Sequence, residues 1–202
     1  MNKKTKAPAG AKPASPATHP LADEVRPGQS LRLLQELHIL TREGKLNQDS
    51  RRKLKQVYHL YQFIEKLMQE LPPTADGTLT LADHGAGKSY LGFILYDLFF
   101  KNLPGSHLYG IETRAELVQK SQALAKELGF ERMSFLNTSV AESTQSATLP
   151  ANVDVVTALH ACDTATDDAI AFGLEKKARA FVLVPCCQAE VCLLYTSPSP
   201  RD

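Results

Sequence analysis

The sequence Leu79-Thr-Leu-Ala-Asp-His-Gly-Ala-Gly-Lys-Ser-Tyr-Leu-Gly-Phe93 decides the fold. It opens with a short apolar run that ends in an acid and two closely spaced glycines, and a largely apolar helical pattern follows from Ser89 to Lys101. Strand, glycine turn and helix in this order are typical of the first β-α unit of a doubly wound sheet, where glycines let a ligand approach the backbone. We therefore expect a ligand site at this turn.

Two ligands fit the glycine turn. A P-loop over Ala82 to Ser89, closing in Gly-Lys-Ser, would bind phosphate, but a P-loop begins with a glycine and Ala82 stands at that position. S-adenosylmethionine (AdoMet) carries a sulfonium cation and a ribose but no phosphate. Its site needs an acid at the strand end and glycines after it, which Asp83, Gly85 and Gly87 provide. The turn favours AdoMet over a nucleotide, and a purely structural turn is the third alternative.

A second acid supports the same choice. Leu108 to Ile111 is an apolar run that predicts a second strand, and Glu112 ends it, where a ribose-binding carboxylate belongs in a dinucleotide-type fold. A P-loop enzyme would instead need a magnesium-binding Asp at the end of a later strand. Asp154 begins its strand, and Asp163 lies in a polar turn beyond it. The second acid therefore favours AdoMet over a P-loop nucleotide hydrolase.

The rest of the chain alternates between strand and helix patterns. Further apolar strands are expected over residues 133–136, 153–159 and 180–184. Thr113 and Glu116 have the spacing of a capping box for the helix that precedes the first of these. This alternation predicts an α/β fold with a Rossmann-like, doubly wound parallel sheet. Ligands on such sheets bind at the carboxyl ends of the strands, where Asn137 and His160 join the two acids.

Two further segments precede the sheet. Residues 1–28 are mainly Lys, Ala, Pro and Thr and predict a disordered tail. Residues 29–73 predict a helical extension, with one helix from Ser30 to Gly44 and a second from about Asp49 to the prolines at 72 and 73. The outer face of the second helix carries the cations Arg51, Arg52, Lys53 and Lys55. These cations would suit RNA, although a solvated helix face is the commoner explanation.

Composition narrows the class of protein. The chain has 202 residues and a net charge of +1, but residues 1–70 hold thirteen Lys or Arg against seven Asp or Glu. No apolar run is long enough to cross a membrane, and no signal-peptide core follows the first lysines, so a soluble, cytoplasmic protein is expected. Four cysteines without Cys-x-x-Cys spacing predict neither a disulfide framework nor a metal site.

Three segments carry a family resemblance: Asp83-His-Gly-Ala-Gly-Lys-Ser-Tyr-Leu, Leu159-His-Ala-Cys-Asp-Thr-Ala-Thr-Asp and Val184-Pro-Cys-Cys-Gln. They resemble motifs of a class I AdoMet-dependent methyltransferase family of bacterial methyltransferase-domain proteins, remotely similar to eukaryotic tRNA 2′-O-methyltransferases. The resemblance spans about residues 50 to 190. It implies an enzyme that methylates RNA. It also implies that Asp83, Gly85 and Gly87 line AdoMet, that Glu112 binds the ribose hydroxyls, and that Asn137 lies beside the adenine.

His160 and Asp163 are the candidate catalytic residues. They follow the fourth expected strand, where a methyltransferase meets its acceptor. Methyl transfer is an in-line displacement, so the enzyme mainly aligns the acceptor and removes its proton, a task that suits histidine. The alternative is that His160 caps the next helix. Cys162, Cys186 and Cys187 either contact the substrate or are small buried apolar side chains, and the latter is the commoner role.

The last residues resemble a sequence of non-native origin. Cys192 to Asp202 match, codon for codon, the translation of a transposase sequencing adapter, whereas the alternative is an ordinary Ser/Pro-rich tail. The adapter interpretation predicts a methyltransferase domain over residues 74–191 that is truncated after the fifth strand and inactive in this form. A non-catalytic module that binds a nucleotide and RNA is the remaining alternative to an enzyme.

Overall fold

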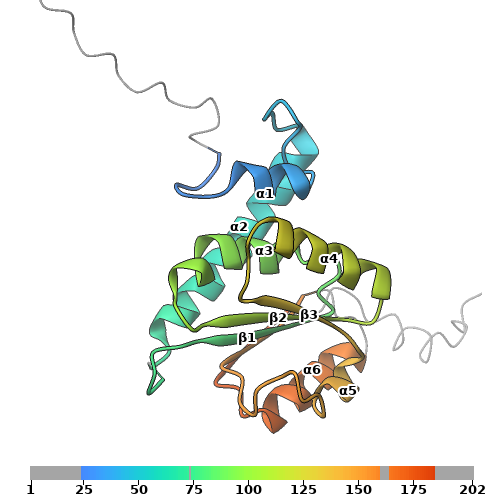
Figure 1. Cartoon of the computed structure of the whole chain (residues 1–202). Coiled ribbons are helices and arrows are strands. Elements are labelled where there is room, and N and C mark those ends of the chain that lie inside the picture. The colour runs from blue at the N-terminus through green and yellow to red at the C-terminus, as the bar shows by residue number, and fades with distance from the viewer. Residues whose placement is uncertain (1–23, 73, 160–163, 185–202) are drawn as a thin grey trace, which may run out of the picture.

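A computed structural model describes residues 24–72, 74–159 and 164–184 of the chain. Five parallel strands form one sheet in the order β3-β2-β1-β4-β5 (Figure 1). The strands are β1 Thr80–His84, β2 His107–Glu112, β3 Met133–Asn137, β4 Val155–Leu159 and β5 Ala180–Val184. This order confirms the expected doubly wound α/β fold. Successive strands are added on one side of β1 as far as β3, and the next two, β4 and β5, are added on its other side.

Several expectations concern residues outside the described ranges. They are the first 23 residues of the expected tail, the candidate catalytic residues His160 and Asp163, the cysteines Cys162, Cys186 and Cys187, and the segment from Cys192 to Asp202.

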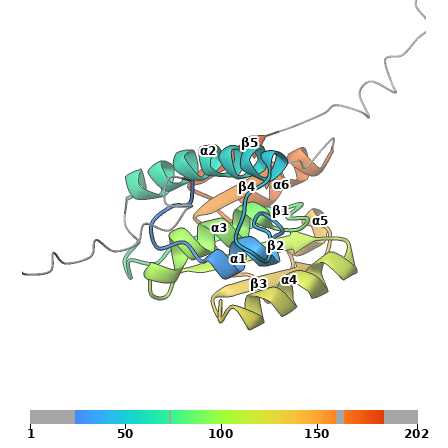
Figure 2. The ribbon, with the colours of Figure 1, turned by 90° about the horizontal axis from the view of Figure 1, so that it is seen from above.

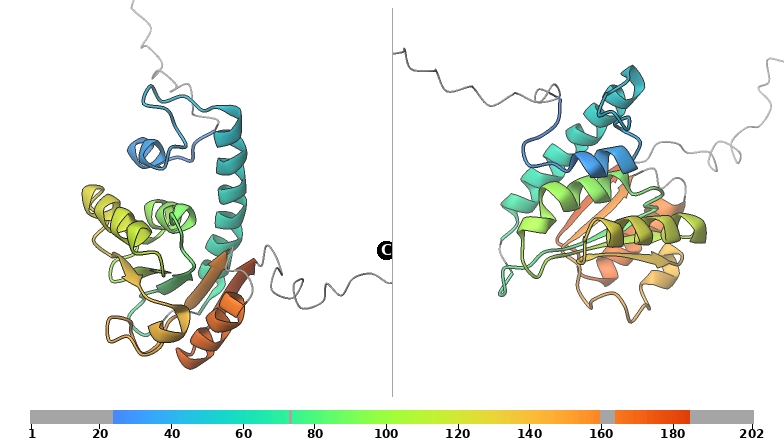
Figure 3. Two further views of the ribbon diagram at one scale, coloured as in Figure 1. Left: turned by 90° about the vertical axis from the view of Figure 1, so that its right-hand side faces the viewer. Right: turned by 45° about the horizontal axis from the view of Figure 1, so that its top comes forward.

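Helices cover both faces of the sheet, as Figures 2 and 3 show. One face carries α2 Gln48–Glu70, α3 Tyr90–Leu98 and α4 Ala115–Glu127, with the short α1 Leu31–Glu36 above them and the 3-10 turn η1 Phe100–Asn102 after α3. The other face carries α5 Val140–Ser143 and α6 Thr164–Glu175. Each face has its own cluster of buried apolar side chains. Among the helices that the structure describes, none is long and apolar enough to cross a membrane.

Helix α2 belongs to the core of the sheet domain. Asn47 caps its start by accepting a hydrogen bond from the Ser50 backbone N–H at 2.8 Å. Its apolar face, with Leu54, Val57 and Ile64, is buried in the same cluster as the side chains of α3 and of the sheet. The helical extension expected before the sheet therefore packs on the sheet and positions its residues against the strand ends.

Two local expectations were wrong. The helix expected from Ser30 to Gly44 ends at Glu36. It ends there because His38 has a left-handed backbone with φ of 54°, and the N–H groups of Ile39 and Leu40 both donate hydrogen bonds to the Leu34 carbonyl. The capping box expected at Thr113 and Glu116 does not form. Helix α4 begins after Arg114 without a side-chain cap, and the capping box of this region lies instead at the start of α5.

Candidate AdoMet site

Asp83 lies at the carboxyl end of β1, and its side chain is buried with 4% exposure. Its Oδ1 accepts a hydrogen bond of 2.6 Å from the hydroxyl of Thr157, which stands opposite it on β4. Burial raises the pKa of Asp83 to about 6, although the hydrogen bond from Thr157 opposes the rise. Asp83 forms no ion pair with any residue in the described ranges. A buried carboxylate without a cation is costly, so a cationic ligand would stabilise it.

Glu112 ends the neighbouring strand and is tied to the glycine turn. Its Oε2 accepts a hydrogen bond of 2.8 Å from the Gly87 N–H, and its Oε1 accepts from the backbone N–H and Nε of Arg114, both at 3.0 Å. Burial alone would raise the pKa of Glu112, but the hydrogen bonds from Arg114 and Gly87 lower it to about 2. Glu112 is therefore an ionised acceptor at neutral pH, and it holds the turn against β2.

Asp83 and Glu112 thus lie at neighbouring strand ends but have opposite pKa shifts. The pKa of Asp83 is raised and that of Glu112 is lowered. Carboxylates whose environments separate their pKa values are a common property of functional sites. Glu112 is already compensated by N–H donors, whereas Asp83 lacks a positive charge. The arrangement suits a ligand that brings a cation to Asp83 and hydroxyl groups to Glu112.

A cavity of about 370 Å³ lies above these strand ends. Its lining includes Asp83, Gly85, Gly87, Lys53, Arg114 and Leu159. Two larger hollows of about 560 and 650 Å³ lie beside α1 and between α4 and β3, away from the glycine turn. The cavity at the strand ends is large enough for a small ligand and holds the uncompensated carboxylate, so we assign the candidate site to it.

Every second residue of the glycine turn, at Gly85, Gly87 and Ser89, has a left-handed backbone conformation. Gly85 and Gly87 have φ angles of 64° and 58°, which glycine adopts without strain. Ser89 has a φ of 51°, an uncommon conformation for a residue with a side chain, and its buried hydroxyl has no hydrogen-bond partner in the described part of the chain. A Cβ atom on Gly110 of β2 would lie 2.6 Å from the Phe135 ring, so this glycine is required where β2 packs against β3.

Ser89→Gly should stabilise the domain. Glycine relieves the left-handed strain, and no hydrogen bond of the hydroxyl is lost, so we expect the free energy of unfolding to rise by about 1 kcal/mol. Urea denaturation would measure it. Ser89→Ala is the matched control, because it removes the hydroxyl but keeps the strain, and it should leave stability within about 0.5 kcal/mol. A loss of stability in Ser89→Gly would show that the hydroxyl or the Cβ stabilises the turn.

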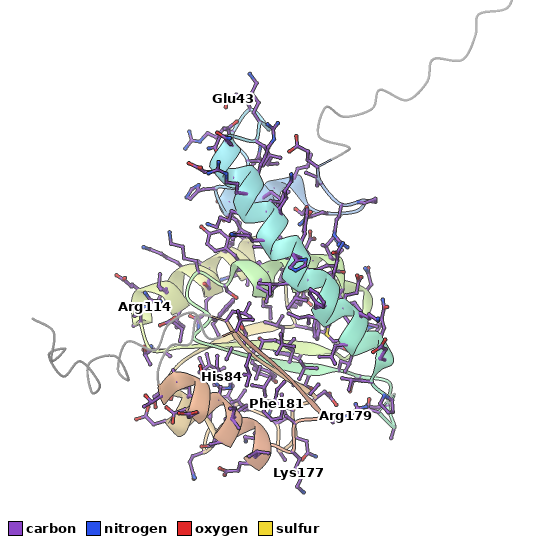
Figure 4. The ribbon with its side chains drawn as sticks, turned by 180° about the vertical axis from the view of Figure 1, so that it is seen from behind. Glu43, His84, Arg114, Lys177, Arg179 and Phe181 are labelled. Carbon is purple, nitrogen blue, oxygen red and sulfur yellow. The ribbon has the colours of Figure 1, made fainter. Side chains whose placement is uncertain are left out.

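His84 follows Asp83 but points to the opposite face of the sheet, between the strands and α6 (Figure 4). Its ring meets Phe172 edge-on with 4.3 Å between the centroids, and neither ring nitrogen has a hydrogen-bond partner among the described residues. Burial lowers the pKa of His84 to about 3, so it is a neutral core residue. It does not line the cavity at the strand ends.

Asn137 lies at the end of β3, opposite Glu112 in the strand register. Its side-chain amide donates hydrogen bonds to the backbone carbonyls of Glu112 at 3.1 Å and Thr113 at 2.7 Å. Asn137 therefore fixes the chain where it leaves β2 and supports the position of Glu112. Neither Asn137 nor Glu112 belongs to the cavity lining, which Gly87 and Arg114, the partners of Glu112, do reach.

The four cations expected to contact RNA have different surroundings. Arg51 forms an ion pair with Glu24 at 2.6 Å, and Arg52 lies 3.8 Å from Asp49. Lys53 turns towards the cavity, where its Nζ lies 3.3 Å from the centre of the Tyr90 ring. Lys55 is exposed to solvent. The cations of α2 are thus divided between the outer surface and the candidate site.

Three residues of the site were missed by sequence reasoning: Thr157, Arg114 and Tyr90. Thr157 has a visible signal, because it is a polar residue within the apolar run of β4 and therefore needs a buried partner. Arg114 and Tyr90 have no comparable signal, since their contacts with Glu112 and Lys53 depend on how the turn and α2 pack.

The fold and the site together define an α/β domain with a buried carboxylate that lines a cavity at a glycine turn. A family model described as a methyltransferase domain matches residues 52–192, and the chain belongs to this family. AdoMet, the cofactor of this class of enzymes, is therefore the cofactor of the domain. The match includes most of α2, in agreement with the packing of this helix on the sheet.

Solved structures with a similar fold include three methyltransferases. TrmK from M. capricolum, in complex with S-adenosyl-homocysteine, is 12% identical with a TM-score of 0.42, over 58% of this chain and 50% of that chain. An rRNA methylase from Streptococcus thermophilus is 13% identical with a TM-score of 0.42, over 58% of this chain and 68% of that chain. A SAM-dependent methyltransferase from Aquifex aeolicus is 18% identical with a TM-score of 0.40, over 64% of this chain and 75% of that chain.

The chain spans half the length of the M. capricolum protein. No curated protein matches the sequence. Likenesses of this extent carry no information about the substrate.

Proposed function

We propose that this domain transfers a methyl group from AdoMet to RNA in the cytoplasm. The main support for AdoMet as the bound cofactor is Asp83, which lines the cavity at the glycine turn. Its carboxylate is buried and has no cationic partner in the described ranges. The sulfonium and ammonium groups of AdoMet are cations that such a carboxylate attracts. Asp83 itself would repel a phosphate, which favours AdoMet over the nucleotide-hydrolase alternative.

The residues that would hold AdoMet come from two strand ends. Asp83 would face the charged methionine part, Gly85 and Gly87 would allow close approach of the ligand, and Glu112 would accept hydrogen bonds from ribose hydroxyls. The acceptor positions of Glu112 are filled by Gly87 and Arg114, so a ribose would displace the guanidinium of Arg114, whose side chain is 62% exposed. When bound, AdoMet supplies a methyl carbon that its sulfonium makes electrophilic.

We assign the proton-removing step to His160, with Asp163 assisting. His160 follows Leu159 directly in the sequence, and Leu159 lines the cavity beside Asp83. A base close to the reacting carbon would take the proton of the acceptor hydroxyl or amine as the new bond forms. His160→Ala should lower turnover while AdoMet still binds, which separates a catalytic role from a structural one.

The RNA part rests on charge and resemblance. Residues 1–70 carry a net charge of +6, and the motifs resemble those of tRNA methyltransferases. Arg51, Arg52, Lys53 and Lys55 of α2 are the proposed contacts. Unlike a protein or metabolite substrate, RNA presents a continuous line of phosphates that such cations attract.

A methyl-transfer assay tests the substrate. Total RNA, protein extract and small metabolites from cells lacking the gene would be incubated separately with the intact, full-length protein and radiolabelled AdoMet. Label should enter the RNA fraction and should fall in the His160→Ala variant. Label that enters protein or metabolites but never RNA would refute the RNA substrate and leave the methyltransferase class intact.

A further inference from the structure

A second cavity adjoins the AdoMet cavity. It measures about 290 Å³ and lies between the end of α1 with the chain that follows it, the start of α3, and the face of α4 that carries Leu117, Lys120 and Leu124. Figures 2 and 3 show α1 above these two helices. Lys88 and Tyr90 line both cavities, so the two spaces meet at the end of the glycine turn. A ligand in the second cavity would therefore lie next to AdoMet.

Three lysines from different elements line the joined cavities. Lys53 comes from α2 and lines the AdoMet cavity, Lys88 comes from the glycine turn and lines both, and Lys120 comes from α4 and lines the second. None of the three forms an ion pair with a residue in the described part of the chain, although Arg51 and Arg52 do. Glu36 also lines the second cavity and is exposed.

The position of these lysines favours a bound polyanion. Like charges that gather around a hollow repel one another, and phosphate groups would relieve this repulsion. Tyr90 at the junction holds the Lys53 ammonium over its ring, 3.3 Å from the centre, and presents an aromatic side chain between the cavities. Lysine and aromatic side chains in one groove are typical of sites for single-stranded nucleic acid.

We propose that the second cavity is the path by which an RNA strand reaches AdoMet, with Lys120 and Lys88 binding phosphates next to the nucleotide that is methylated. This inference rests on the proposed function. The target nucleotide would pass Tyr90 into the AdoMet cavity. A cavity of about 290 Å³ cannot enclose a double helix, so the acceptor nucleotide would be single-stranded or flipped out of its helix.

RNA binding at several salt concentrations tests the path. A fluorescently labelled single-stranded oligoribonucleotide of mixed sequence would be titrated with the wild-type chain and with Lys88→Ala and Lys120→Ala. A phosphate contact on a single strand contributes about 0.7 to the slope of log affinity against log salt, so each variant should lose about fivefold in affinity at 0.1 M salt. The slope should fall by about 0.7 per variant.

Two controls make the result specific. Lys126→Ala changes an exposed lysine of the same helix as Lys120 that lies outside both joined cavities, and its RNA affinity should equal that of the wild type. Lys120→Ala should leave the calorimetric affinity for AdoMet unchanged, which excludes a folding defect. If Lys55→Ala lowers the salt slope while Lys88→Ala and Lys120→Ala do not, RNA lies along the outer face of α2 and the path is wrong. Wild-type protein that binds no RNA would instead refute the RNA substrate itself.

Discussion

Replacing Glu112 with alanine is expected to weaken AdoMet binding by about 1 to 3 kcal/mol, which is roughly 5- to 150-fold in affinity. The carboxylate is ionised, because hydrogen bonds from Arg114 and Gly87 keep its pKa near 2, and it is the acceptor at the end of β2. Without it, the ribose hydroxyls lose a charged partner. Calorimetric titration with AdoMet would measure the loss.

Two comparisons separate this effect from a general loss of structure. Glu116→Ala removes an exposed carboxylate from the first turn of α4, outside the cavity, and should leave the affinity unchanged. Glu112→Gln keeps an acceptor oxygen for the Gly87 N–H and should lose less than Glu112→Ala. Equal affinity in Glu112→Ala and the wild type would show that the ribose is not bound at this strand end.

Asp83→Asn is expected to stabilise the ligand-free protein at neutral pH and to weaken AdoMet binding. The pKa of Asp83 is raised by burial from its ordinary value near 3.8 to about 6. A raised pKa in the folded state means that the carboxyl group favours folding below pH 4 and that this contribution is lost as pH rises to 6. A shift of about two units corresponds to about 3 kcal/mol, and asparagine avoids this loss.

Urea denaturation between pH 4 and pH 8 checks the sign. The free energy of unfolding of Asp83→Asn should rise relative to that of the wild type as pH rises to 6. The difference should reach up to about 3 kcal/mol. Glu131→Gln, which alters an exposed acid, should show no such trend. The proposed contact is between AdoMet and the ionised form of Asp83, so wild-type affinity for AdoMet should rise over the same range. A variant that is less stable than the wild type at pH 7 would show that a cation already compensates Asp83.

The sheet and the place of the site were predictable because their signals are local. The apolar runs at Leu79 to Ala82 and Leu108 to Ile111 are short, end in acids and alternate with helical patterns, which is enough to define parallel strands joined by helices. A doubly wound sheet brings its carboxyl ends together. Asp83 and Glu112 therefore meet at the glycine turn without any further information.

The features that the sequence did not predict depend on contacts between distant segments. Thr113 and Glu116 have the spacing of a capping box, but the start of α4 is set by the contacts of Arg114 with Glu112. Arg51 belongs to a basic run, yet Glu24 pairs with it across 27 positions. Such pairings follow from packing, which local periodicity does not encode.

We expect the cavity at the glycine turn to bind AdoMet and not a nucleoside triphosphate. Calorimetric titrations of the same protein with AdoMet and with ATP in the presence of Mg²⁺ test it most directly. AdoMet should bind at one site and more tightly than ATP, because Asp83 attracts a cation and repels phosphate. Tighter binding of ATP with Mg²⁺, lost in Lys88→Ala, would show that the glycine turn is a phosphate-binding loop and not an AdoMet site.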